Sequence, residues 1–71
     1  MPFEILVKQV RKQLGLSQEQ LAREMNISFS TINRWEKGKN KPSQMAKELF
    51  IAFCINNGIN ITSMEEEDTQ L

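Results

Sequence analysis

Residues able to form directional hydrogen bonds share one face of a short helical pattern in the middle of the chain. This face carries Phe29, Ser30, Asn33, Arg34 and Lys37. The planar fork of Arg34 can donate two hydrogen bonds to guanine O6 and N7, and the Asn33 amide can pair with adenine N6 and N7. The alternatives are a salt bridge from Arg34 to Glu24 or Glu36, and a phosphate contact from Asn33. The chemistry that this face offers is recognition by hydrogen bonding.

The first turn of the same pattern carries an apolar and a small polar residue. Ser30 can bond to a base edge or to a phosphate with little preference, whereas Phe29 can only make an apolar contact, for example with a thymine methyl. Alternatively, Phe29 leans on Ile27 and on the preceding helix. Trp35 could stack on a base, but it shares the face of Ile32, which favours a core position.

Residue types needed for catalysis or metal binding are scarce. The sequence has no His and no Tyr, its single Asp is Asp68, and its only Cys, Cys54, lies in an apolar run without an adjacent base. Acid–base chemistry, nucleophilic chemistry and metal ligation therefore lack their usual residues. We expect no enzyme activity, no metal and no cofactor, and we expect Cys54 to be a buried, reduced thiol.

Two serine-capped helices are predicted to position the hydrogen-bonding face. Ser17 can cap a helix that begins at Gln18, and Gln20 can complete a capping box. Asn26 can end this helix because asparagine tolerates positive φ, and Ser28 can cap the next helix. Two short helices joined by a tight turn form a helix-turn-helix, which here spans about residues 18–37.

The string from residue 18 to residue 37 resembles the helix-turn-helix of phage repressor and Cro-type domains, also called the xenobiotic-response-element type. The matching positions are Gln18, Leu21, Ala22, Met25, Asn26, Ile27, Ile32 and Trp35. The resemblance extends from about Ile5 to about Asn57 and departs from the family at Asn26, where glycine is usual, and at Phe29, where a polar residue is common. It implies an all-α, lambda-repressor-like bundle of four or five short helices that reads double-stranded DNA in the major groove.

The resemblance also assigns roles to three residues outside the hydrogen-bonding face. Gln18 matches a position whose side chain contacts a backbone phosphate or braces a polar residue at the start of the recognition helix. Because Phe29 stands at that start, the phosphate contact is the expected role. Arg11 and Glu36 match positions that form a structural ion pair.

The zero net charge of the chain hides a segregation of charges. Residues 1–64 carry nine Lys and Arg against five Glu, a net charge of +4, and residues 65–68 carry −4. A cluster of lysines directly follows the recognition helix, where it is well placed to meet phosphates, although a solvated loop is the alternative. The expected phosphate contacts around this loop are Lys37, Lys39, Asn40, Lys41 and Ser43.

Two further helices are predicted on either side of the helix-turn-helix. One runs from near Pro2 to Leu14, and the other from a cap at Ser43 to about Asn57. Residues 49–55 of the second are apolar at every position. One face of this helix can pack on the core, but the opposite apolar face then needs a cover of its own. Residues 59–62 could fold back over it, it could form a dimer seam, or both. The dimer that we expect is joined through this helix and residues 59–61, with Cys54 and Ile55 at the seam.

These patterns predict one DNA-binding domain over residues 1–62 and an acidic, disordered tail over residues 63–71. We expect a small prokaryotic or phage transcriptional regulator that acts as a homodimer in the cytoplasm, at the nucleoid. No segment has the roughly 18 apolar residues of a membrane span. The alternatives are a DNA-binding antitoxin that holds a protein partner and the targeting module of a larger DNA-modifying protein.

Overall fold

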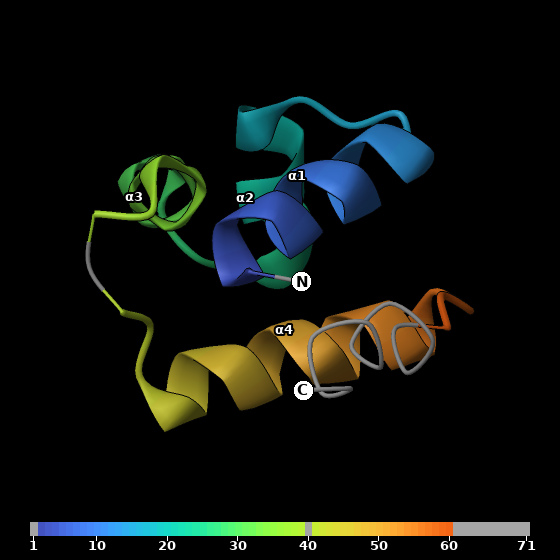
Figure 1. Cartoon of the computed structure of the whole chain (residues 1–71). Helices are drawn as coiled ribbons and strands as arrows, with labels where there is room; N and C mark the ends of the chain where they lie inside the picture. Colours follow the sequence, from blue (N-terminus) through green and yellow to red (C-terminus); the bar gives the residue numbers. More distant parts are fainter. Residues whose placement is uncertain (1, 40, 61–71) are drawn as a thin grey trace.

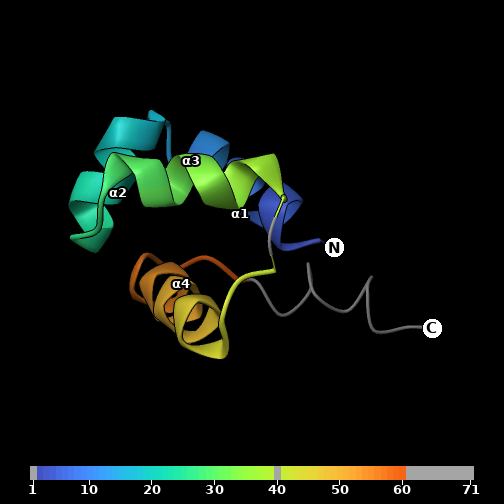
Figure 2. The same cartoon turned by 90° about the vertical axis from the view of Figure 1, so that its left-hand side faces the viewer.

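The computed structural model describes residues 2–39 and 41–60. In this part of the chain there are four helices and no strand: α1 (Phe3–Gln13), α2 (Gln18–Met25), α3 (Phe29–Lys37) and α4 (Gln44–Asn56). The first three helices lie together on one side of α4 (Figure 1). Turned by 90°, α3 runs across α1 and α2 at the outside of the domain (Figure 2). The all-α prediction is confirmed, and any fifth helix would fall outside the described residues.

Serine caps set the first turn of three helices. The side chains of Ser17, Ser28 and Ser43 accept hydrogen bonds from the backbone N–H groups three residues further on. At α2, Ser17 Oγ lies 3.1 Å from Gln20 N, and Gln20 Oε1 lies 2.8 Å from Ser17 N. The predicted capping box is therefore present, and both partners satisfy a donor that the helix itself cannot.

The turn between α2 and α3 depends on one left-handed residue. Asn26 has φ 58° and ψ 42°, a conformation that asparagine adopts at smaller cost than most residues other than glycine. The next residue, Ile27, donates its N–H to the carbonyl of Ala22 at 2.9 Å, which closes the turn. Ala22 itself is buried, so its small side chain allows α3 to approach α2. The asparagine thus performs the role expected of glycine here.

Three aromatic rings join α4 to the rest of the core. The rings of Phe3, Trp35 and Phe50 meet edge to face, with centroids 5.3, 5.5 and 6.3 Å apart. Such contacts add stability beyond the apolar area that they bury. Since the three rings come from α1, α3 and α4, they hold α3 against both neighbours. The prediction that Trp35 is a core residue is confirmed.

The apolar run of α4 is only partly covered. Phe50 and Cys54 are fully buried, and Ile59 folds back so that its side chain is buried as well. Leu49 and Ile55 remain 43% and 64% exposed. The expectation of a buried thiol at Cys54 is confirmed. Because this thiol faces the core of its own chain, the expectation that Cys54 also lies at a dimer seam is wrong. Residue 61 onward, including the acidic tail, lies outside the described residues.

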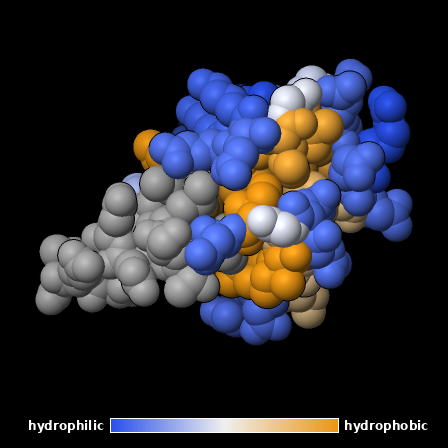
Figure 3. All heavy atoms as spheres, turned by 90° about the vertical axis from the view of Figure 1, so that its right-hand side faces the viewer, coloured by the Kyte–Doolittle hydropathy of each residue, from blue (hydrophilic) through white to orange (hydrophobic). Residues whose placement is uncertain are grey.

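Apolar surface is visible on the side toward which α1 and α4 both run. Figure 3 shows apolar atoms gathered in the middle of this face, with hydrophilic residues around them. In the described ranges, no helix is long and apolar enough to cross a membrane.

Candidate nucleic-acid interface

A charged pair ties the end of α3 to α1. Arg11 donates two hydrogen bonds to the carboxylate of Glu36, from Nε to Oε2 at 2.7 Å and from Nη2 to Oε1 at 3.0 Å. The remaining arm of Arg11 donates to the carbonyl of Leu16 at 3.1 Å. The side chain of Glu36 is only 3% exposed and that of Arg11 18% exposed. The ion pair implied by the family resemblance is therefore present, largely out of contact with water.

The environment of Glu36 changes its acidity. Burial alone would raise the pKa of this carboxyl, but the hydrogen bonds from Arg11 and Gln18 and the positive charge of Arg11 outweigh burial and lower it. The same hydrogen bond with Glu36 raises the pKa of Arg11. Both groups are thus held in their charged forms.

The lowered pKa of Glu36 predicts a loss of stability in acid. A carboxylate with a lowered folded-state pKa contributes its full stabilisation above the ordinary glutamate pKa of about 4.3, and loses it as the pH falls through the folded-state value. We expect the free energy of unfolding in urea to fall as the pH is lowered from about 5 to about 3. The Glu36→Gln variant should show a smaller fall. Equal falls in the two proteins would contradict the assignment.

Gln18 on α2 links the charged pair to a second residue of α3. Its Nε2 donates to Glu36 Oε1 at 3.0 Å, and its Oε1 accepts from Asn33 Nδ2 at 3.1 Å. We had discounted a bracing role for this side chain because Phe29 stands at the start of α3. This was wrong: the braced residue is Asn33, one turn further along. No spacing rule within a single helix predicts this contact, since it joins residues of two helices.

The outer face of α3 is exposed along its length. Phe29 is 48% exposed, and Ser30, Arg34 and Lys37 are also exposed. Ser30 Oγ lies 3.1 Å from Ser28 Oγ, within the capping turn. Asn33 lies at the edge of this face, half-buried and held by Gln18. α3 therefore presents a polar surface with one large apolar side chain at its N-terminal end.

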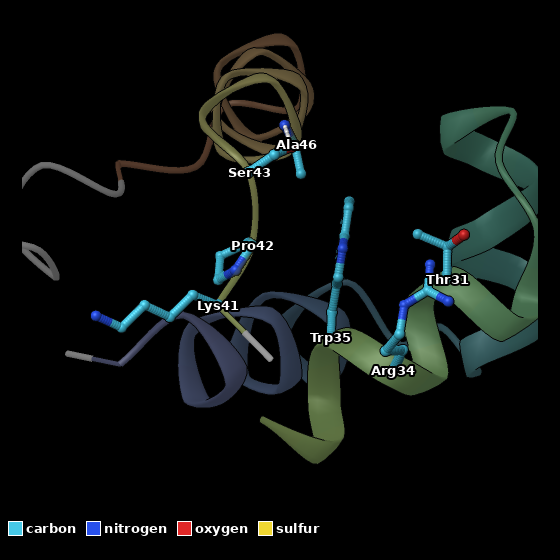
Figure 4. A pocket seen from close by; sticks show the side chains of 7 residues that line it. All are labelled: Thr31, Arg34, Trp35, Lys41, Pro42, Ser43 and Ala46. Atoms are coloured by element: carbon cyan, nitrogen blue, oxygen red, sulfur yellow. Dashed lines mark hydrogen bonds between the residues drawn. The ribbon is translucent and has the colours of Figure 1, made fainter. Parts of the chain in front are cut away.

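Arg34 lies on the side of this face that borders α4. It lines a pocket of about 300 Å³ together with Thr31, Trp35, Lys41, Pro42, Ser43 and Ala46. In Figure 4 the guanidinium lies beside Thr31, the Trp35 ring points toward Ala46, and the Lys41 side chain points away from Arg34. Across the described ranges, no ion pair joins Arg34 to Glu24 or Glu36, since the latter is paired with Arg11. The alternative of a salt bridge for Arg34 is not observed.

The basic loop and the start of α4 continue the surface of α3. Lys37, Lys39 and Lys41 are all exposed. Ser43 uses its hydroxyl oxygen to cap α4, accepting from Ala46 N at 3.1 Å, so it brings the N-terminus of that helix next to the pocket. Asn40 lies outside the described residues. Two of the predicted lysines and the helix start thus follow α3 as one positively charged edge.

The described residues thus form a helix-turn-helix with a largely buried Arg–Glu pair and an exposed outer face on its second helix. Residues 7–46 match the sequence profile of a family described as helix-turn-helix. The chain belongs to this helix-turn-helix family. It is 32% identical over 62 residues to the HTH-type transcriptional activator BcrR of Enterococcus faecalis, a match that covers 87% of this chain and 28% of the relative.

A second helix-turn-helix relative covers about half of the chain. It is an uncharacterized HTH-type transcriptional regulator of Methanothermobacter thermautotrophicus (strain ATCC 29096 / DSM 1053 / JCM 10044 / NBRC 100330 / Delta H), 45% identical over 38 residues, or 54% of this chain and 55% of the relative. The chain therefore spans between about a quarter and about half the length of these two curated relatives. A search of solved structures gives no significant match. Within the described ranges, no group of three His, Cys, Asp or Glu could hold a metal ion.

Proposed function

We propose that this helix-turn-helix domain binds double-stranded DNA sequence-specifically, with α3 in the major groove, as part of a small transcriptional regulator. The observation that supports the proposal most directly is the exposed polar face of α3, anchored from behind by the buried Arg11–Glu36 pair. A recognition helix must be held rigidly because base contacts depend on the placement of each side chain. Selection of bound duplexes from a random pool tests the proposal, and a pool without enrichment would contradict it.

The residues on and around α3 divide into two proposed classes. Base contacts come from Phe29, Ser30, Asn33 and Arg34. Phosphate contacts come from Lys37, Lys39, Asn40, Lys41 and Ser43, and from the backbone N–H groups at the start of α2 beside Gln18. The protein then needs no catalytic residue or cofactor, and it acts where the chromosome lies, in the cytoplasm. No contact in the described ranges favours the antitoxin or the targeting-module alternative.

The two classes predict different responses to mutation. Arg34→Ala should cost about 1–3 kcal/mol on the selected site, with much less on random DNA, because a bidentate contact to one base is lost. Lys39→Ala and Lys41→Ala should each weaken binding to all duplexes alike. Each should also lower by about one the magnitude of the slope of log binding constant against log salt concentration. Titrations of both DNA types at several salt concentrations would measure these effects. Equal losses on the two DNA types would remove Arg34 from the base-reading class.

We further propose that the working form is a two-fold dimer joined through the outer face of α4. Met45, Leu49 and Ile55 are exposed on this helix, at 79%, 43% and 64%. At helical spacing, Met45 and Leu49 lie one turn apart, and Ala52, which is also exposed, continues their stripe. We propose that a second copy of the chain covers this face, since one small domain reads too few base pairs to find its site in a genome.

A further inference from the structure

We infer that Gln18 is a positioning residue that fixes the orientation of the Asn33 amide, so that Asn33 reads an adenine. This inference rests on the proposed function, because it concerns how the DNA-binding surface becomes specific. It starts from a chain of hydrogen bonds that crosses three helices. The chain runs from Arg11 on α1 through Glu36 on α3 and Gln18 on α2 to Asn33 on α3.

The charged pair decides the direction of every hydrogen bond in this chain. Arg11 can only donate, and an ionised Glu36 can only accept. Glu36 Oε1 therefore requires the NH₂ group of Gln18, whose Nε2 lies 3.0 Å away. The carbonyl of Gln18 must then point the other way, where it accepts from Asn33 Nδ2 at 3.1 Å. Rotating either amide by half a turn would place an acceptor against an acceptor or a donor against a donor.

Asn33 is left with one free N–H and a free carbonyl oxygen. These are the two groups that pair with N7 and N6 of adenine in the major groove. The nitrogen side of the amide is held toward Gln18, so the donor and the acceptor are presented in one fixed order. A freely rotating amide at an exposed position would lose conformational entropy on binding and could offer its groups in either order. The chain of hydrogen bonds thus makes Asn33 an oriented reader.

Gln18→Glu is the sharpest test, since it keeps the shape of the side chain and removes its donor. At about pH 8 the new carboxylate faces the carboxylate of Glu36, and the like charges separate. At about pH 5.5 the carboxyl at position 18 should take up a proton and share it with Glu36, because the carboxylate of Glu36, which Arg11 keeps ionised, raises the pKa of its new neighbour. The shared proton restores a donor toward Glu36 and leaves an acceptor toward Asn33. The loss of orientation should therefore reverse on acidification.

Gln20→Glu is a matched control on the same helix. It adds the same charge two residues away. Gln20 Oε1 accepts from Ser17 N in the capping box, and a glutamate in that place would accept equally well. A change in base preference seen with Gln18→Glu and not with Gln20→Glu therefore reports the contact to Asn33, not the added charge.

The experiment is selection from a random duplex pool by the wild type and the variants at both pH values. We expect the wild type to select adenine at one position, roughly tenfold or more over the other bases, and Asn33→Ala to lose this preference. Gln18→Glu should lose it at about pH 8 and regain it at about pH 5.5. Gln20→Glu should keep it at both, and Gln18→Ala should lose it at both.

Two outcomes would overturn the inference while leaving the proposed function intact. One is an adenine preference that survives Gln18→Glu and Gln18→Ala at about pH 8. The other is enrichment of sites in which no base depends on Asn33. A wild-type pool without any enrichment would instead overturn the proposed function. Thermal melts of each variant, read by circular dichroism, separate loss of fold from loss of preference, and Gln18→Ala provides the test should Gln18→Glu fail to fold.

Discussion

Glu36→Ala should destabilise the domain by about 3–5 kcal/mol, the cost of breaking a buried ion pair from one side. The guanidinium of Arg11 would stay in place, held at Leu16, without a carboxylate to balance it. Gln18 would also lose the acceptor of its Nε2. A chain of 71 residues has roughly 4–11 kcal/mol of stability in total, so this cost would remove a large part of the free energy of unfolding. Urea unfolding followed by circular dichroism would measure the change.

A double-mutant cycle separates the pair from the general effect of deleting side chains. Removing Arg11 and Glu36 together should cost less than removing Glu36 alone, since no unpaired charge then remains. Lys12→Ala is a suitable control because Lys12 is an exposed cation on the same helix as Arg11. Additive costs at positions 11 and 36 would show that the two side chains do not interact and would contradict the role assigned to the pair.

Local rules explain why most of the fold could be predicted from the sequence. The three serine caps, the left-handed Asn26 and the end of α3 at Gly38 each depend on a few adjacent residues. Helical periodicity likewise places Ile32 and Trp35 in the core. Such signals do not require knowledge of how the helices pack, and the helix boundaries therefore lie within about one residue of the predicted ones.

The errors all concern contacts between helices. Periodicity leaves an all-apolar run such as that of α4 without a preferred face, and so Cys54 was assigned to the wrong side. Gln18 is the first residue of α2 and Asn33 lies in the middle of α3, so their hydrogen bond follows only from the angle at which the two helices meet. The Arg11–Glu36 pair spans a still longer separation and was reached only through the family resemblance.

The dimer proposal predicts a large effect of DNA symmetry on binding. A two-fold dimer would place its recognition helices about 34 Å apart, one turn of DNA, and would need an inverted-repeat site. Scrambling one half-site should weaken binding about 100-fold or more, since at least two contacted base pairs are lost. Footprinting combined with sedimentation of the complex would check this: one protomer bound to an asymmetric site at saturating protein would contradict the dimer.

The exposed face of α4 allows the same prediction to be tested from the protein side. Ile55→Asp puts a charge at a position that is 64% exposed, so the monomer should keep its fold while a seam on this face would lose apolar contact. The variant should then sediment as a monomer and bind a whole site and a half-site with the same affinity. Ile5→Asp is the matched control, because Ile5 is an isoleucine on a different helix, α1, and is 42% exposed. A dimer joined through this face would have to bury the new carboxylate without a partner, which is costly. If Ile55→Asp kept the preference for inverted repeats, the dimer would therefore have to form through another surface.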